Sequence, residues 1–225
     1  MNVALHAFPG DAAQAQRLAD AMRLPLALVQ THVFPDGEIL PRVPPPAPTT
    51  IVYRSLHHPN NKLVELLLAA DGWRRGGARR LVLVAPYLPY MRQDTAFASG
   101  EPVSQRVIAG LLDGAFDRIV AVDPHIHRIN ALGDVFPTAE CTLLHGGDAL
   151  VPYLQASGDA PKWLVVGPDS ESAPWVRRIA DQLGLDHAVM EKRRRGDLSV
   201  EIVVPEGLSP SGRPVLLVDD ICSSG

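Results

Sequence analysis

The sequence predicts an α/β protein built from parallel sheets whose faces are covered by helices. Two observations indicate this fold class. Short runs rich in β-branched and other apolar residues alternate with segments whose apolar residues recur at the spacing of a helix. The same alternation repeats in the second half of the chain, so two similar units are expected. With 46% hydrophobic residues, a chain of 225 residues can bury a sizeable core.

The first unit is expected to contain parallel strands and the helices that connect them. Apolar or β-branched runs predict strands at residues 3–8, 27–34, 38–43, 50–56, 80–85 and 118–122. Asp11 is expected to cap the first helix, and Asn60 or Asn61 the second, which a glycine pair at 76 and 77 ends. A third helix is expected from Pro102 to about residue 115.

The second unit is expected to repeat this order. Its strands are predicted at 140–144, 162–166, 188–191, 198–204 and 215–218, and its helices near 147–155 and 171–183. The segment 134–137 is a plausible boundary, which places the first domain at 1–137 and the second at 138–225. The proline run at 44–48 is a stiff surface connection that is too short to be a domain linker.

Composition favours a cytoplasmic protein and excludes some partners. The net charge of −4 gives no global basic field, so no nucleic-acid partner is expected. The longest apolar run, at 81–91, is interrupted by two prolines and is too short to cross a membrane. Residues 1–8 resemble a first strand rather than a signal peptide. The two cysteines form no disulfide framework, which fits a reducing compartment.

The most informative segment is the end of the chain. A buried-type strand at 215–218 leads into two adjacent carboxylates and a small, hydroxyl-rich turn. Carboxylates suit ribose hydroxyls or Mg²⁺, and such a turn offers N–H and hydroxyl groups to a 5-phosphate. The residues concerned are Asp219, Asp220, Ser223, Ser224 and Gly225. The alternative is a buried strand that simply exits into a polar turn.

Two clusters in the first unit are candidates for nucleotide binding. Asp36, Gly37 and Glu38 form a turn with two outward carboxylates between predicted strands, although Pro-Asp-Gly is also an ordinary turn sequence. After the strand at 80–85, two tyrosines precede Arg92 and Gln93, which are suited to stacking on a base and contacting phosphates. A solvated loop is the equally weighted alternative for this second cluster.

Two further clusters are candidates for a metal. Asp123, His125 and His127 follow the strand at 118–122, but no Cys or third His lies at the spacing of a zinc site. A magnesium site would use carboxylates and waters, with His acting mostly through a water. Asp169 lies in a strand-to-helix turn that could present it to a cation. In the alternative, a neighbouring serine at 170 or 172 caps the helix.

A run of four cations at 192–195 follows a predicted strand. Such a run could be a solvated face or a nucleic-acid patch. We favour a mobile cationic loop that folds over phosphates and neutralises charge during group transfer, because the chain as a whole is acidic. Lys192 and Arg194 are its candidate catalytic residues.

Taken in this order, the clusters resemble those of ribose-phosphate diphosphokinases, also called phosphoribosyl-diphosphate synthetases, over essentially the whole chain. The resemblance implies two phosphoribosyltransferase-like domains with parallel sheets flanked by helices. The second domain is expected to be truncated and the 225-residue chain to be an inactive fragment, because the family continues beyond the position of Gly225. It also implies transfer of the diphosphoryl group of ATP to ribose 5-phosphate, with Mg²⁺ as cofactor, in a homo-oligomer (dimer or hexamer).

The resemblance also implies a role for each candidate residue. Lys192 and Arg194 would be catalytic; Asp36, Gly37, Glu38, Arg92 and Gln93 would bind ATP; Asp123, His125 and Asp169 would serve Mg²⁺; and Asp219, Asp220, Ser223, Ser224 and Gly225 would bind ribose 5-phosphate. The sequence departs from the family in the neutral segment 95–98 and in Ser223-Ser224, which replaces an Asp-Thr pair. Two alternatives remain: a base-transferring phosphoribosyltransferase and a non-catalytic regulatory homologue.

Overall fold

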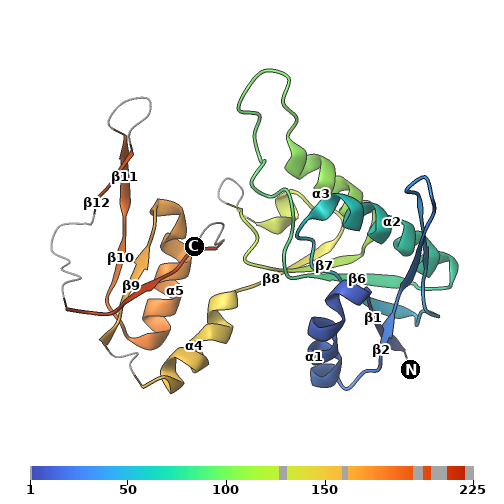
Figure 1. Cartoon of the computed structure of the whole chain (residues 1–225), viewed down its shortest axis with the longest axis horizontal. Helices are drawn as coiled ribbons and strands as arrows, with labels where there is room; N and C mark the ends of the chain where they lie inside the picture. The colour runs from blue at the N-terminus through green and yellow to red at the C-terminus, as the bar shows by residue number, and fades with distance from the viewer. Residues whose placement is uncertain (1, 127–130, 159–161, 195–199, 204–211, 221–225) are drawn as a thin grey trace. The chain divides into compact units, whose positions relative to one another are not determined.

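The computed structural model describes residues 2–126, 131–158, 162–194, 200–203 and 212–220. They form two compact units, Met1–Leu144 and His145–Gly225, each with its own parallel sheet (Figure 1). The division falls later than the predicted boundary at 137/138. The physical reason is strand β8 (Glu140–Leu144), which pairs with β7 (Arg118–Val122) and so completes the sheet of the first unit.

The first unit has a six-stranded sheet in the order β2-β1-β5-β6-β7-β8, and every neighbouring pair in it is parallel. Its first four strands are β1 (Val3–Ala7), β2 (Leu26–Leu28), β5 (Thr49–Tyr53) and β6 (Arg80–Ala85). The single strand predicted at 27–34 is divided. Its first part is β2, whereas β3 (Gln30–Val33) leaves the sheet and pairs antiparallel with β4 (Ile39–Arg42).

Helices cover both faces of this sheet: α1 (Ala12–Met22) lies on one, and α2 (Pro59–Arg75) and α3 (Ser104–Ala115) on the other (Figure 1). Right-handed crossovers explain why the helices lie on opposite faces. Along the sheet, the chain moves from β1 to β2 in one direction and from β5 through β6 to β7 in the opposite direction. The expected caps were wrong. Asp11 occupies the N-cap position of α1 without a side-chain cap bond, and α2 begins at Pro59, before either asparagine.

The core between the sheet and α2 and α3 is aromatic at its centre. Phe8, Trp73, Phe116 and Phe136 are all at most 2% exposed. His6 of β1 also faces this core, with its ring centroid 5.8 Å from that of Trp73. The His6 Nδ1 and Trp73 Nε1 atoms are buried without a hydrogen-bond partner among the described residues. Burial of the imidazole lowers the pKa of His6 from 6.5 to about 4.

The buried imidazole predicts a loss of stability in mild acid. The unfolded chain protonates His6 as the pH falls through 6.5, whereas the folded protein resists until about pH 4. Stability is therefore lost between these values, by about 3 kcal/mol in full. Urea unfolding at pH 7 and pH 4.5 should show a smaller difference for His6→Leu than for the wild type. His187→Leu, which replaces an exposed histidine, is the control. If both variants lost the same stability between pH 7 and pH 4.5, buried His6 would not be the cause of the acid sensitivity.

The second unit contains α4 (Gly146–Ala156), α5 (Ala173–Leu183) and a parallel sheet in the order β10-β9-β13. Its strands are β9 (Leu164–Gly167), β10 (His187–Val189) and β13 (Val215–Leu217). Strands β11 (Glu191–Arg194) and β12 (Val200–Val203) form a separate antiparallel ribbon. The start of the predicted cationic loop is therefore part of a strand, because residues 191–194 pair with β12.

The two units repeat one topology. In the first, β1, α1 and β2 are followed by the ribbon β3–β4, and β5 then pairs with the free side of β1. In the second, β9, α5 and β10 are followed by the ribbon β11–β12, and β13 pairs with the free side of β9. This match confirms the prediction of two similar α/β units and makes β5 and β13 equivalent strands.

Helices in the described part of the chain are all too short or too polar to span a membrane.

Candidate functional site

Each unit has one place where strand order reverses, and in such sheets ligands bind beyond the carboxyl ends of the strands on either side. In the second unit this place lies between β9 and β13. The turn after β9 contains Asp169, and Asp219 and Asp220 follow β13. The parallel register pairs Leu217 with Val166, so both strands end at the same edge. The sheet therefore brings together the sequence-predicted carboxylates of this unit.

Burial and neighbouring negative charge both disfavour the ionised form of Asp219. Burial raises the pKa of Asp219, and the charges of Asp220 and Asp169 raise it further. The backbone N–H of Asp220 opposes the shift by donating to Asp219 Oδ1 at 3.0 Å. A cation would relieve the repulsion between these side chains. Ser223, Ser224 and Gly225, which were predicted to bind the 5-phosphate, lie outside the described residues.

Asp169 is held by the turn that it caps. Its Oδ1 accepts the N–H of Glu171 at 3.1 Å, and its carbonyl oxygen accepts the Ser172 hydroxyl at 2.6 Å. The serines at 170 and 172 do not cap the helix; Asp169 supplies the side-chain cap of the short 3₁₀ turn before α5. Gly167 allows this turn to fold tightly over the strand, because a Cβ there would lie 2.8 Å from Val176 Cγ2.

The predicted catalytic residues Lys192 and Arg194 lie on β11. Lys192 is opposite Ile202 and Arg194 is opposite Val200 in the antiparallel pairing with β12. The two residues are two positions apart on this strand, so the pairing fixes the backbone of both. Residues 195–199, which complete the predicted loop, lie outside the described residues.

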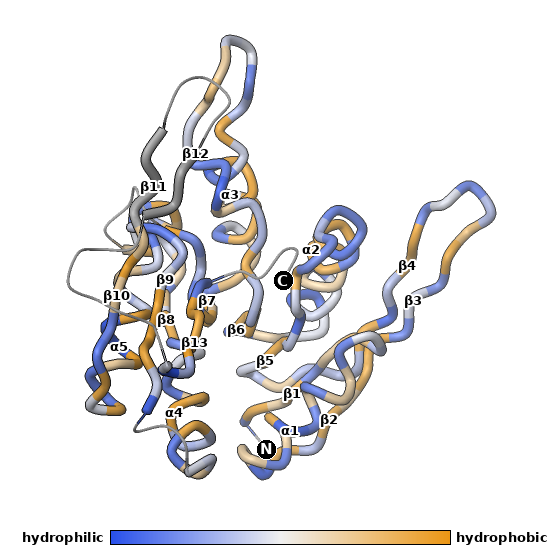
Figure 2. The backbone as a smooth tube through the Cα atoms, turned by 60° about the vertical axis from the view of Figure 1, so that its left-hand side comes forward, coloured by the Kyte–Doolittle hydropathy of each residue, from blue (hydrophilic) through white to orange (hydrophobic). Residues whose placement is uncertain are grey.

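In the first unit, Asp36, Gly37 and Glu38 form the tip of the β3–β4 ribbon, which projects away from the sheet (Figure 2). Phe34 N–H donates to Glu38 O at 2.8 Å, and Gly37 N–H donates to Phe34 O at 2.9 Å. Gly37 has a φ of 92°, which a side chain would disfavour. Asp36 Oδ1 accepts the N–H of Glu38 at 3.1 Å, and both carboxylates are exposed to solvent.

Arg92 and Gln93 lie exposed in the loop after β6, which buried Leu88 and Met91 anchor to the core. Sequence reasoning missed the residue that fixes this loop. Gln105 is 2% exposed, its side-chain amide donates to Met91 O at 3.1 Å, and its backbone N–H donates to Gln93 O at 3.0 Å. A lone glutamine in an amphipathic helix gives no signal of this role, because it resembles any polar surface residue.

Asp123 and His125 follow β7, as predicted, and both are half-buried. Asp123 has a φ of 39°, and its N–H donates to Leu144 O at 2.9 Å, so the end of β8 holds this turn. His127 lies outside the described residues. No three His, Cys, Asp or Glu side chains within the described ranges are arranged to hold a metal by themselves.

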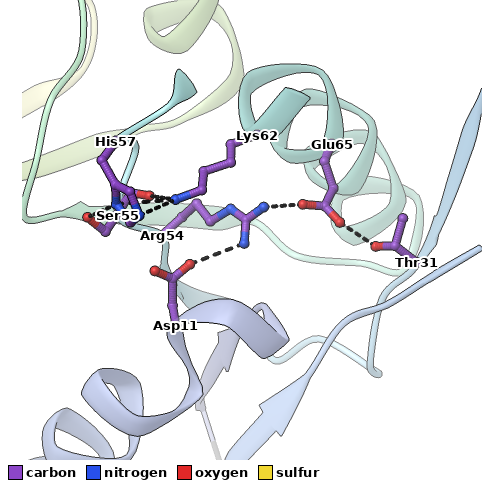
Figure 3. A network of polar contacts seen from close by, with 7 residues as sticks. All are labelled: Asp11, Thr31, Arg54, Ser55, His57, Lys62 and Glu65. Carbon is purple, nitrogen blue, oxygen red and sulfur yellow. Dashed lines mark hydrogen bonds and ion pairs between the residues drawn. The ribbon is translucent and has the colours of Figure 1, made fainter. Parts of the chain in front are cut away.

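The first unit also has a reversal of strand order, between β1 and β5, and charged side chains fill it (Figure 3). Arg54, just after β5, forms ion pairs with Asp11 and with Glu65 of α2. Beside it, Lys62 Nζ donates to Ser55 O at 2.8 Å and lies 3.2 Å from His57 Nε2. Partial burial lowers the pKa of Lys62; the charge of Asp11 opposes this shift, and the nearby Arg54 adds to it. Apart from Asp11, which was expected to cap α1, none of these residues was assigned a role from the sequence.

Comparisons with known proteins agree with this arrangement. A family model described as the N-terminal domain of ribose phosphate pyrophosphokinase matches residues 5–115, and a phosphoribosyl transferase domain model matches 154–225. The chain is 34% identical over 212 residues to a ribose-phosphate pyrophosphokinase of Methanopyrus kandleri, covering 93% of this chain and 71% of that protein. The corresponding enzyme of Pyrococcus furiosus is 31% identical over 204 residues, covering 90% of this chain and 71% of the relative.

A solved structure is similar as well. The crystal structure of phosphoribosylpyrophosphate synthetase from Mycobacterium smegmatis matches with a TM-score of 0.81 and 28% sequence identity. The match covers 97% of this chain and 71% of that one. Both units of the present fold therefore have counterparts in that protein.

Proposed function

We propose that this chain, which belongs to the ribose-phosphate pyrophosphokinase family, transfers the diphosphoryl group of ATP to the anomeric hydroxyl of ribose 5-phosphate. The products are phosphoribosyl diphosphate and AMP. The observation that carries the proposal is the position of four motifs after parallel strands, at the edge where ligands bind: Arg92 and Asp123 follow β6 and β7, and Asp169 and Asp219 follow β9 and β13.

The reaction requires positioning and charge compensation rather than a protein nucleophile. The anomeric oxygen attacks the β-phosphorus, the bond from this phosphorus to the oxygen bridging the α-phosphate breaks, and AMP leaves with the bond electrons. The hydroxyl proton is released. Negative charge develops on the leaving oxygen and around the transferred group, where cations stabilise the transition state. We assign this role to Lys192 and Arg194, which lie two positions apart on β11.

Each substrate is assigned to one unit: ribose 5-phosphate to the second and ATP to the first. Asp219 and Asp220 are proposed to accept hydrogen bonds from the ribose hydroxyls, and Ser223, Ser224 and Gly225 to hold the 5-phosphate. ATP is assigned to Asp36, Gly37 and Glu38 of the ribbon tip and to Arg92 and Gln93. The exposure of these last side chains supports the assignment, because a nucleotide can reach them.

Mg²⁺ is the proposed cofactor, and the residues fit it by their chemistry. Carboxylate oxygens are the ligands that Mg²⁺ prefers, and the mutual repulsion of Asp169, Asp219 and Asp220 would be relieved by a cation. Asp123, His125 and Asp169 are the proposed protein contacts of the metal. Bound Mg²⁺ would neutralise phosphate charge. Because no described trio of ligands could hold the ion alone, we expect Mg²⁺ to enter with the nucleotide rather than as a tight structural metal.

We further propose a cytoplasmic homo-oligomer, a dimer or a hexamer. Exposed apolar side chains on the β3–β4 ribbon support association, since Val33 is 63% exposed and Leu40 is 55% exposed. The free thiol of Cys141 is consistent with a reducing compartment.

The proposed function is tested by incubating the natural full-length protein with ATP, Mg²⁺ and ribose 5-phosphate and separating the products. We expect AMP and phosphoribosyl diphosphate in equal amounts, and no AMP when ribose 5-phosphate is omitted. A base-transferring enzyme would instead consume phosphoribosyl diphosphate only when a nucleobase is added. A regulatory homologue would bind nucleotide and form neither product, and either result would overturn the proposal.

A further inference from the structure

The repeated topology makes the polar cluster of the first unit equivalent to the ribose-phosphate loop of the second. Strands β5 and β13 occupy the same place in their sheets, so Arg54 and Ser55, which follow β5, correspond to the segment of Asp219 and Asp220 after β13. One unit thus has carboxylates at this place, and the other has a guanidinium and a hydroxyl.

In the first unit the equivalent position is occupied by Arg54 and the two carboxylates that pair with it. Arg54 is 6% exposed, and its Nη1 lies 3.1 Å from Asp11 Oδ2. Its Nη2 pairs with Glu65 Oε2, and its guanidinium carbon lies 4.1 Å from the centre of the Phe8 ring. Both Nη atoms of this guanidinium are paired with carboxylates and an aromatic ring covers it, so only its Nε, which is buried without a partner among the described residues, is left for a phosphate. This position therefore serves structure rather than ligand binding.

The network continues from the buried core to the β3–β4 ribbon. The second oxygen of Glu65, Oε1, accepts the hydroxyl of Thr31 at 2.5 Å, and Thr31 belongs to β3 at the base of the ribbon (Figure 3). The same helix packs against β4, and Gly72 permits close approach to Val43, directly after this strand, because a Cβ at Gly72 would lie 3.2 Å from Val43 Cγ2. The ribbon is thus attached to α2 on both strands, and Thr31 supplies the polar attachment.

We infer that Arg54, Glu65 and Thr31 are positioning residues, which set the direction of the β3–β4 ribbon and thereby place Asp36 and Glu38 for ATP binding. The inference rests on the proposed function, since it assumes that the ribbon tip contacts ATP. An isolated two-stranded ribbon is only marginally stable in water, so its direction depends on what holds its base. Arg54 orients Glu65, and Glu65 in turn orients Thr31.

The test removes one hydroxyl from the outer end of the network. Thr31→Val is expected to raise the KM for ATP about tenfold, because the ribbon loses its hydrogen bond to Glu65 and no longer holds Asp36 and Glu38 in position. The KM for ribose 5-phosphate and kcat should change little, since Thr31 does not touch the reacting atoms. Thr31→Ser, which keeps the hydroxyl, should restore the KM for ATP.

A matched control separates positioning from general stability. The hydroxyl of Thr142 in β8 also forms a hydrogen bond with a charged side chain, because it accepts from Arg118 Nη2 at 2.7 Å. Thr142 lies outside the β3–β4 ribbon. Thr142→Val should lower the unfolding temperature about as much as Thr31→Val without raising the KM for ATP. Hydrogen exchange of backbone amides at 30–42 should become faster in Thr31→Val and stay unchanged in Thr142→Val.

The outcomes distinguish the inference from the proposed function. If the wild type forms no AMP from ATP and ribose 5-phosphate, the proposed function fails, and the exchange measurement still decides whether Thr31 holds the ribbon. Unchanged exchange at 30–42 in Thr31→Val overturns the inference even in a fully active enzyme. Faster exchange together with an unchanged KM for ATP also overturns it, because the ribbon would then have no part in ATP binding.

Discussion

Lys192→Ala is expected to lower kcat by at least about a hundredfold, because it removes a charge that stabilises the transition state. The KM values for ATP and ribose 5-phosphate should change much less, as expected for an interaction made mainly in the transition state. The unfolding temperature should remain close to that of the wild type, since Lys192 lies on a two-stranded ribbon outside the three-stranded sheet. Steady-state kinetics and thermal unfolding of the purified protein measure both effects.

Lys162→Ala is the matched control for this prediction. Lys162 precedes β9 in the same unit and is exposed, so its removal changes the net charge equally without affecting the ribbon. It should retain nearly full activity. Near wild-type turnover in Lys192→Ala, or unfolding of that variant, would show that the catalytic assignment of Lys192 is wrong.

The parallel strands and their positions along the chain could be predicted because each strand leaves a local pattern in the sequence. Buried strands such as β6 are continuous apolar runs, and polar residues such as Asp123 immediately follow the strand. Since the ends of parallel strands share one edge, knowing where a strand ends is enough to place the residues after it. In the second unit Asp169 follows β9 and Asp219 and Asp220 follow β13, so the register of these two strands brings the three residues to the same edge of the sheet.

Features that depend on distant residues could not be predicted in this way. Asp11 has the sequence context of a helix cap, but its carboxylate pairs with Arg54, which is 43 positions away. The segment 27–34 is apolar enough for one strand, but only pairing shows that β3 leaves the sheet for β4. The boundary between the units depended on β8, whose place is decided by its partner β7. Each of these outcomes depends on tertiary contacts, which the local spacing of residue types does not reveal.

The largest expected effect on stability comes from Arg54. Arg54→Met should lower the free energy of unfolding by about 3–5 kcal/mol, because it leaves buried carboxylates without their cation. The side chains of Asp11 and Glu65 are only 4% and 14% exposed, so water cannot replace the guanidinium easily. Methionine fills a similar volume and can still pack on Phe8, so the loss reflects charge rather than a cavity. Urea unfolding monitored by circular dichroism measures it.

Two comparisons make the cause identifiable. Arg75→Met removes a similar ion pair, with Asp71 at 2.7 Å, but the side chains of Arg75 and Asp71 are 80% and 65% exposed. This substitution should therefore lower the free energy of unfolding by less than about 1 kcal/mol. Combining Arg54→Met with Asp11→Asn and Glu65→Gln neutralises the stranded carboxylates and should recover much of the lost stability, because unpaired buried charge is the main penalty. If Arg54→Met costs no more than Arg75→Met, or if the triple variant is less stable than Arg54→Met alone, the buried network does not stabilise the first unit by charge pairing. The role of Arg54 would then be limited to packing against Phe8.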